Sequence, residues 1–258
     1  MSLDADLGDR MKAYEATPRL LPLLPTLVRL DGKNFHGFCN GLRRPYDERL
    51  SSVMQGVTAY LLEETRAVVG YTQSDEITLC LYSADYKSQT FFDGKTQKIV
   101  SVLASMCTLE FQRRCRQELP EKADARALFD CRVFQVPTLD EAANVFVWRE
   151  LDATRNSLEM AARHYYSQKE LHGKNSAALH EMLHTVDVNW NDYPGLFKRG
   201  TYYGWRDEPL TLRVVRLGDV DGGTIRVHKR VTALQLEPIL SYPDRVKVLF
   251  PCTVADSE

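Results

Sequence analysis

The sequence predicts an α+β protein whose core is a split β-α-β unit of the ferredoxin-like type, with helical additions and a C-terminal β-rich extension. The expected elements follow the order strand, helix, strand, strand, helix, strand, which is the order of that unit. The chain has 258 residues, 44% of them hydrophobic, so it is long enough to bury a large core. Roughly the last fifty residues alternate apolar and polar positions, a pattern typical of strands.

The first half of the core combines a strand, a capped helix and a hairpin. Residues 24–30 form an apolar, strand-like run that ends at Asp31-Gly32. Asp47 is a suitable N-cap for a helix over 48–65, in which apolar residues recur at helical spacing. Residues 67–71 and 76–82 are rich in β-formers, and the polar turn at 72–75 between them indicates a hairpin.

The remaining segments complete the core and extend it. Apolar periodicity favours a helix at the N-terminus within 1–19, where Leu7, Met11 and Tyr14 share one face. The other expected elements are a helix over 96–117, a strand over 129–136, a helix from 138–140 past Tyr166, and strands within 212–217, 224–231 and 246–250.

Charge, cysteine content and hydropathy exclude several classes of protein. The 33 basic and 35 acidic residues leave a net charge of -2, so any nucleic-acid contact must use local basic patches. The six cysteines contain no C-x-x-C pair, which argues against a zinc ribbon and indicates reduced thiols. No apolar run approaches the roughly 20 residues that a bilayer requires, and no signal peptide is recognisable. We therefore expect a cytoplasmic protein without a membrane partner.

The chemically most informative feature is a pair of acidic turns. Asp31-Gly32 ends one strand, and Ser74-Asp75-Glu76 lies in the hairpin turn, so the split β-α-β arrangement brings both to one edge of the sheet. Two nearby carboxylates repel each other unless a cation lies between them, and Mg²⁺ prefers oxygen ligands. The alternative is that Asp31 and Asp75 are ordinary turn residues, since Asp is favoured in turns.

Eight segments of the chain form recognisable motifs: LGDRMKAYE (7–15), VRLDGKNFHGF (28–38), RRPYDERL (43–50), YTQSDEITL (71–79), FDCRVF (129–134), WRELDATRNS (148–157), LHGKN (171–175) and FKRGTYY (197–203). Together they resemble the tRNA-His guanylyltransferase family, most closely its bacterial, archaeal and phage Thg1-like branch. The resemblance covers roughly residues 5–205 in the family's order. It implies a polymerase-type palm over 1–206, with 207–258 as a strand-rich extension of the same unit.

The family resemblance also implies a reaction. The enzyme would use two Mg²⁺ ions to add nucleotides to the 5′ end of tRNA in the 3′-5′ direction. ATP would activate the 5′-monophosphate, and the 3′-hydroxyl of GTP or another NTP would then displace AMP. Both steps are phosphoryl transfers, in which positioning and charge neutralisation dominate catalysis. Members of the family are usually homo-tetramers, arranged as a dimer of dimers.

The resemblance assigns roles to residues that match the family's motifs. Asp31, Asp75 and the Gly32 carbonyl match the metal ligands, and Glu76 and Ser74 match residues that support catalysis. The positions that match nucleotide-binding residues are Arg29, Lys33, Asn34, Phe35, His36, Arg44, Asp47, Lys95 and Lys98. Those expected to contact RNA are Arg132, Asn156, Lys198 and Arg199. The alternative for the Lys198-Arg199 pair is an ordinary solvated surface.

Departures from the family pattern bear on the substrate. Thr154 and Met160 occupy positions where eukaryotic members carry His and Asn, and Cys131 replaces the usual Gly. The first two substitutions favour the Thg1-like branch, whose members repair truncated tRNA 5′ ends on a template. Addition of a single G to tRNA-His is the alternative.

Two alternatives come from other functional classes. His180-Glu181-Met182-Leu183-His184 is a literal HExxH motif, which in zinc metalloproteases places two His ligands and a general base on one helix. Only Glu208 is available as a loosely placed third ligand, so the alternative is a pair of surface histidines. The other possibility is a catalytically inactive RNA-binding module, against which Asp31, Asp75 and Glu76 argue.

Overall fold

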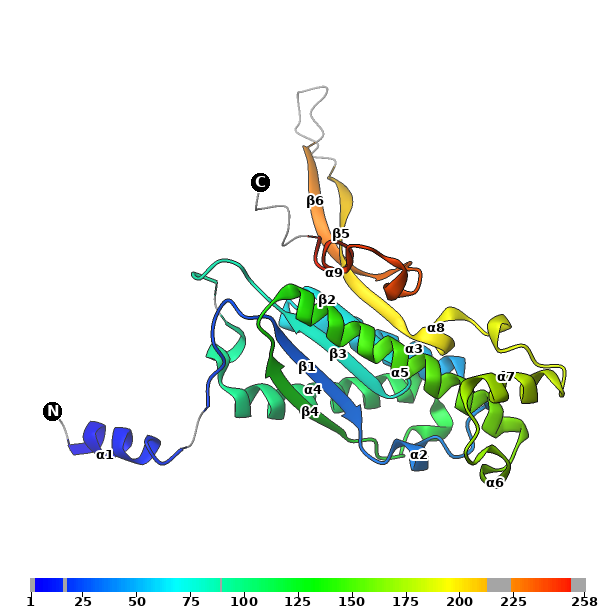
Figure 1. Cartoon of the computed structure of the whole chain (residues 1–258). Coiled ribbons are helices and arrows are strands. Elements are labelled where there is room, and N and C mark those ends of the chain that lie inside the picture. Colours follow the sequence, from blue (N-terminus) through cyan, green and yellow to red (C-terminus); the bar gives the residue numbers. More distant parts are fainter. Residues whose placement is uncertain (1–2, 16–17, 89, 213–223, 252–258) are drawn as a thin grey trace.

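One antiparallel sheet organises the computed structural model, which describes residues 3–15, 18–88, 90–212 and 224–251. The strand order is β4-β1-β3-β2-β5-β6 (Figure 1). The strands are β1 (Thr26–Gly32), β2 (Val69–Gln73), β3 (Glu76–Leu81), β4 (Phe129–Gln135), β5 (Thr201–Leu212) and β6 (Thr224–Leu234). β1 is an inner strand that pairs with both β3 and β4, so its end is flanked by the hairpin turn on one side.

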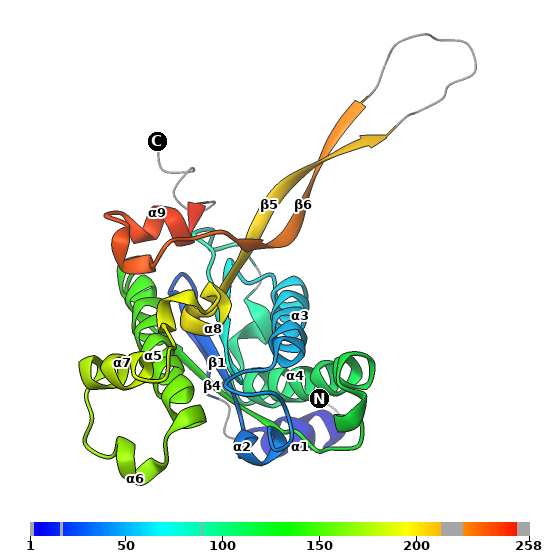
Figure 2. The same cartoon turned by 90° about the vertical axis from the view of Figure 1, so that its right-hand side faces the viewer.

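Helices cover both faces of the sheet. The α-helices are α1 (Leu3–Lys12), α2 (Phe35–Phe38), α3 (Glu48–Thr65), α4 (Thr96–Glu118), α5 (Leu139–Tyr165), α6 (Gln168–Leu171), α7 (Ser176–His184), α8 (Gly195–Arg199) and α9 (Arg245–Leu249). Single-turn 3-10 helices are η1 (Phe91–Gly94), η2 (Pro120–Lys122), η3 (Trp190–Asp192) and η4 (Ile239–Ser241). In Figure 2, α3 and α4 lie on one side of the sheet and α5 on the other.

The alternation of side chains along β1 explains these two layers, because successive residues of a strand point to opposite faces. Val28 and Leu30 join α3 and α4 in one apolar core. Leu27 points the other way and packs with α5 residues such as Phe146 in a second core. Arg29 and Asp31 are the polar residues of β1 on this second face, where Arg29 packs against Trp148 of α5.

The expected core elements are confirmed with small shifts of their ends. α3 has the predicted limits, and the Asp47 side chain caps it by accepting a hydrogen bond from the Arg49 amide. Thr138 caps α5 by accepting from the Glu141 amide at 3.1 Å. The hairpin turn, the second long helix and β4 also lie where the pattern indicates.

The C-terminal part differs from expectation at two elements. β5 begins at Thr201, ahead of the strand expected within 212–217. Residues 246–250 were expected to form a strand, which is wrong: α9 covers Arg245–Leu249. The Asp244 side chain accepts a hydrogen bond from the Lys247 amide, which starts the helix, and Leu249 and Phe250 then pack into the core. The strand expected over 224–231 is confirmed by β6, whereas 213–217 lie outside the described residues.

The strands β5 and β6 form a long ribbon that continues the sheet and projects from it (Figure 2). β5 pairs with β2 from Thr201 to Gly204 and with β6 along its full length. The expected boundary between residues 206 and 207 therefore falls inside β5, a strand that begins in the main sheet. Among the described residues, no helix has the length and apolar character needed to cross a membrane.

Candidate functional site

The two acidic turns lie side by side at one edge of the sheet. Asp31 is the register partner of Glu76, and the Gly32 amide donates a hydrogen bond to the Asp75 carbonyl at 3.2 Å. A Cβ added to Gly32 would lie 2.8 Å from Asp75 Oδ2, so the Asp75 carboxyl group lies directly against the end of β1. The expected convergence of these segments is confirmed.

The hairpin turn holds Asp75 in a defined orientation. Ser74 adopts a left-handed backbone with φ of 54°, which is uncommon outside glycine. Its hydroxyl donates to Asp75 Oδ1 at 3.0 Å. Ser74 therefore both shapes the turn and orients the neighbouring carboxyl group.

The electrostatics of the site favour a cation next to Asp75. Burial, and secondly the charge of Asp31, raise the pKa of Asp75 from 3.8 to about 6. In the described part of the chain, Asp75 has no salt-bridge partner. Asp31 has one distant partner there, Arg132, whose Nη2 lies 3.7 Å from Asp31 Oδ2. Two incompletely neutralised carboxylates at one edge are the arrangement that a divalent cation relieves.

Glu76 belongs to a separate ion pair. Arg149 of α5 donates to both of its oxygens, at 2.6 and 2.8 Å, and both side chains are largely buried. Burial raises the pKa of Glu76 while Arg149 opposes that rise. The negative charge of Glu76 is therefore already neutralised by the protein, unlike that of Asp75.

The donor set of the site fits magnesium. The carboxylates of Asp31 and Asp75 and the carbonyl of Gly32 are oxygen donors, which Mg²⁺ prefers, and it usually keeps water and phosphate oxygens in the rest of its shell. No group of three or more His, Cys, Asp or Glu side chains is placed to hold a metal in the described ranges. A magnesium site here would thus use two carboxylates completed by backbone and substrate oxygens.

A cavity of about 440 Å³ opens beside Asp75. Its lining comes from the loop after β1, the segment before α3, the hairpin turn, α5 and α8. The predicted site residues among its lining are Phe35, His36, Arg44, Asp47, Ser74 and Asp75. A partly apolar cavity with converging charged groups is typical of a ligand site.

The loop after β1 divides its side chains between the cavity and other surroundings. His36 is exposed at the cavity, whereas Phe35, which also lines it, is buried in an aromatic cluster with Phe111. Asn34 is exposed and adopts a left-handed backbone just before α2. Lys33 lines a different, shallow depression with Leu128, so it lies outside the cavity.

Asp47 both lines the cavity and caps the N-terminus of α3. It is buried and accepts hydrogen bonds from the amides of Arg43 and Arg49 and from the Arg49 guanidinium. The bond from the Arg49 side chain is the main reason that its pKa falls to about 2. The neighbouring Arg44 is exposed at the cavity mouth, where it is available to a phosphate.

The cavity also contains residues that the sequence patterns did not indicate. Tyr46 stacks on Phe197 with ring centroids 4.6 Å apart, and Arg163 and His164 project from α5. Other unpredicted polar residues of the lining are Cys39, Arg43, Ser51 and Gln73. Burial raises the pKa of Cys39 to about 11. Arg163 lies seven residues after Asn156, on the same helix face, which is the signal that could have found it.

The expected RNA-contacting residues fall in two places. Asn156 is exposed on α5, next to Ser157, whose hydroxyl donates to the Lys198 carbonyl at 3.1 Å. Lys198 and Arg199 end α8, near the same part of α5. Arg132 lies instead on β4, between Asp31 and Asp130, with half of its side chain exposed.

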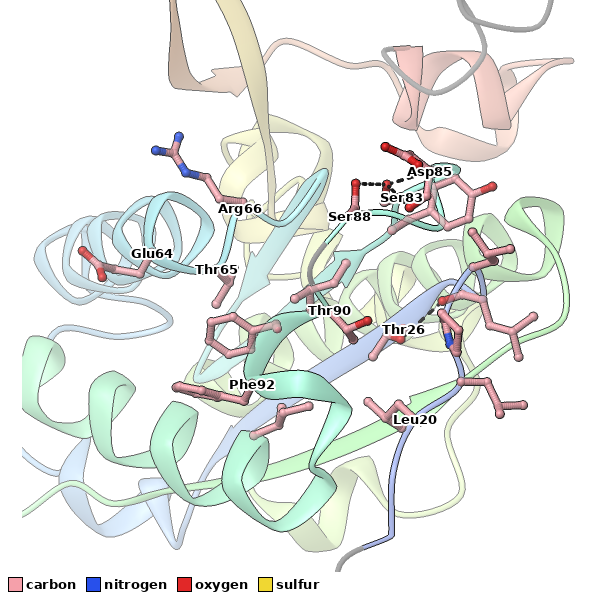
Figure 3. Close-up of a pocket in the computed structure, with 18 residues that line it drawn as sticks. Leu20, Thr26, Glu64, Thr65, Arg66, Ser83, Asp85, Ser88, Thr90 and Phe92 are labelled. Carbon is pink, nitrogen blue, oxygen red and sulfur yellow. Dashed lines mark hydrogen bonds between the residues drawn. The ribbon is translucent and has the colours of Figure 1, made fainter.

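Lys95 and Lys98 are not brought to the carboxyl pair within one chain. They begin α4, at the end of the sheet where β1 starts, whereas Asp31 lies at the end of β1. A second cavity of about 480 Å³ lies there, with Leu20, Thr26 and Phe92 in its wall (Figure 3). Lys98 Nζ lies 4.7 Å from the centroid of the Phe92 ring. Arg29 also lies outside the first cavity, where it packs against the Trp148 ring of α5.

The HExxH segment forms a helix without a metal site in the described residues. His180 packs edge-on against the Trp190 ring at 5.6 Å, and His184 ends α7. No described group of three ligating side chains includes either histidine. In the described residues, His180 and His184 thus lie on a short helix as the surface-histidine alternative describes.

Comparisons with known proteins agree with this geometry. The family model for tRNAHis guanylyltransferase matches residues 8–137. A bacterial tRNA(His) guanylyltransferase (Thg1)-like protein solved in complex with ATP has a TM-score of 0.80 and 31% identity, covering 95% of this chain and 98% of that one. The complex of such a protein with GTP has a TM-score of 0.72 and 30% identity, covering 92% and 94%. The tRNA(His) guanylyltransferase of Debaryomyces hansenii is 28% identical over 210 residues, 74% of this chain and 77% of the relative.

The sheet with its acidic edge, the adjoining cavity and these relatives define the chain as a nucleotidyltransferase. It belongs to the tRNAHis guanylyltransferase family.

Proposed function

We propose that this protein adds nucleotides to the 5′ end of tRNA in the 3′-5′ direction. ATP first reacts with the 5′-monophosphate, which gives a 5′-adenylylated RNA and pyrophosphate. The 3′-hydroxyl of GTP or another NTP then attacks that 5′-phosphate, and AMP leaves. The observation that carries the proposal is the Asp31–Asp75 pair, whose Asp75 member lines a cavity, in a chain similar to proteins solved with ATP and with GTP.

The side chains of the site support this chemistry through positioning and charge. We propose that Asp31, Asp75 and the Gly32 carbonyl hold magnesium, which would neutralise charge on the reacting phosphates when bound. Arg44 and His36 would bind phosphate oxygens at the cavity mouth, and the Tyr46–Phe197 stack would pack against a base. Glu76 would fix the hairpin by its bond to Arg149.

We further propose that the segment β1-α3-β2-β3-α4-β4 is a ferredoxin-like, polymerase-type palm. Its strands lie in the order β4-β1-β3-β2 and its helices α3 and α4 lie on one face. In this proposal residues 1–206 form the catalytic unit, and 207–258 extend its sheet. We also propose that the protein is cytoplasmic and forms a homo-tetramer.

As the biological reaction we propose repair of truncated tRNA 5′ ends on the opposite strand as template. Thr154 and Met160, at positions where the eukaryotic pattern has His and Asn, support repair over G addition restricted to tRNA-His. A comparison of templated with non-templated substrates separates the two reactions.

The test is extension of a 5′-monophosphorylated tRNA that lacks its first nucleotide, with ATP, GTP and Mg²⁺. Wild type should give the extended product, and Asp31→Ala and Asp75→Ala should each lose it by at least about 1000-fold, since removing a metal-site carboxylate removes most electrostatic stabilisation. Glu181→Ala in the HExxH segment is the control and should extend normally. Full activity of either aspartate variant would contradict the proposed site.

A further inference from the structure

An exposed tryptophan on the α5 side of the sheet has no role in the mechanism above. Trp148 is 49% exposed, whereas Trp190 is 9% exposed and the Trp205 indole donates a hydrogen bond to the Ala67 carbonyl at 2.7 Å. A single exposed apolar residue is ordinary in itself. The contacts of Trp148 are what distinguish it.

Two guanidinium groups pack against the Trp148 ring. Arg149 Cζ lies 4.4 Å and Arg29 Cζ 5.3 Å from its centroid. Arg149 is itself fixed by Glu76 and, at 3.0 Å, by Asp152. Among the described residues, Arg29 forms no salt bridge and its buried Nε has no hydrogen-bond partner. The indole thus contacts two cations, of which Arg149 is fixed by its carboxylate partners, while about half of its surface remains open.

Both cations connect Trp148 to the carboxyl pair. Arg29 precedes Asp31 by two positions on the same face of β1, a separation of about 7 Å along the strand. Arg149 binds Glu76, which is the register partner of Asp31 and the neighbour of Asp75. Since stacked nucleotides rise about 3.4 Å each along a duplex strand, Trp148 lies within a few nucleotide steps of the reacting end.

We propose that Trp148 stacks on a base of the RNA substrate close to its 5′ end and so holds that end at Asp31 and Asp75; this inference rests on the proposed function. Aromatic side chains bind single-stranded bases by stacking, with added cation–π contributions from arginine. Trp148 does not line the 440 Å³ cavity, so a nucleotide seated there would leave it free for RNA. The half-exposed Arg132 on β4 offers a phosphate contact on the same face.

The first experiment measures binding without catalysis. Full-length protein is titrated onto a fluorescent, 5′-monophosphorylated acceptor-stem RNA in EDTA without nucleotides. Trp148→Ala should weaken binding about tenfold, which is within the range for loss of one stacked base, and Trp148→Phe should stay within about threefold of wild type. Leu109→Ala is the control, because Leu109 is 71% exposed on α4. Unchanged affinity of Trp148→Ala would overturn the inference.

The second experiment asks whether the lost contact is with a base. Abasic nucleotides are placed one at a time at the first three positions of the 5′ strand. At one position, the abasic RNA should bind wild type about tenfold more weakly than the intact RNA does. Trp148→Ala and wild type should then bind that abasic RNA with equal affinity. If the effect of Trp148→Ala is the same on every abasic RNA, stacking on these bases is excluded.

Kinetic data separate this inference from the proposed function. Trp148→Ala should raise the KM for RNA and leave the KM for GTP and ATP within about twofold. A raised KM for GTP with unchanged RNA affinity would assign Trp148 to the incoming nucleotide and overturn the inference. Wild-type protein that neither binds nor extends RNA would overturn both proposals, whereas active wild type with fully RNA-binding Trp148→Ala would overturn this one alone.

Discussion

At the residue scale, the carboxyl group of Asp75 couples stability to the proposed metal. Its pKa of about 6 in the folded chain exceeds its ordinary 3.8, so between about pH 4 and 6 the folded state keeps a proton that the unfolded chain has lost. The free energy of unfolding must therefore fall as the pH rises through this window. Two units correspond to about 3 kcal/mol at most.

Asp75→Asn should relieve this cost. Without divalent ions we expect the variant to be more stable than wild type at pH 7, by up to about 3 kcal/mol, and similar to it at pH 4. Urea denaturation in EDTA at both pH values measures the difference. Added Mg²⁺ should stabilise wild type more than the variant. A stability difference that is the same at pH 4 and pH 7 would contradict this account of Asp75.

Only part of the site was predictable from single residues. Asp31 and Asp75 were predictable because turns at the ends of neighbouring strands meet at one edge. Arg163 shares a helix face with Asn156 and could have been proposed from that spacing. His164 was missed because its place at the cavity depends on where the 27-residue helix α5 passes the hairpin, which periodicity leaves open. Trp148 was not predictable as a site residue, since exposure of an aromatic residue is decided by packing.

At the element scale, α3 links the cavity to the fold through its N-cap. Asp47→Ala removes the cap and the partner of Arg49, and we expect it to lower the free energy of unfolding at neutral pH by about 2 kcal/mol. Because the folded pKa of Asp47 is about 2, below its ordinary 3.8, this stabilisation is present above about pH 4 and is lost as the pH falls toward 2.

Denaturation at pH 7 and pH 2.5 checks this prediction. Asp47→Asn should lose less than Asp47→Ala, since an amide oxygen still caps the helix. Asn175→Ala removes the uncharged N-cap of α7 and should cost about 1 kcal/mol at both pH values. If the loss caused by Asp47→Ala is independent of pH, the ion pair contributes nothing to α3.

Most elements were predictable because several local signals agree. For α3, the cap at Asp47 and the apolar stripe indicate the same limits, and the polar turn before Glu76 separates β2 from β3. α9 was misread because Val246, Val248 and Phe250 alternate like a strand, while Val246, Leu249 and Phe250 also fit helical spacing. A five-residue pattern does not separate the two, and the Asp244 cap decides for the helix.

At the scale of the whole molecule, the distance between Lys95–Lys98 and the carboxyl pair needs an explanation. The family resemblance assigns these lysines to binding a triphosphate. Both lysines, however, lie together at one end of the sheet, and Asp31 lies at the other end. A tetramer resolves the conflict if the lysines of one copy reach the site of another. We expect that assembly to be required for activity.

Mixed assemblies test this arrangement. Asp31→Ala and the double variant Lys95→Ala/Lys98→Ala should each be inactive alone and regain about a quarter of wild-type extension after refolding or co-expression as mixtures. A mixture of Asp31→Ala with Asp75→Ala should stay inactive, because both changes affect the same site. Absence of recovery in the first mixture would contradict a site shared between subunits. It would mean that the lysines act within their own subunit or have no role in the reaction.

The most direct measurement of the central claim is Mn²⁺ binding by electron paramagnetic resonance, with Mn²⁺ in place of Mg²⁺ and GTP present. The meeting of Asp31 and Asp75 around a divalent cation predicts that wild type binds Mn²⁺ and that Asp31→Asn and Asp75→Asn each lose at least about tenfold in affinity, a cost of about 1.4 kcal/mol or more. Unchanged Mn²⁺ affinity in both variants would contradict the claim.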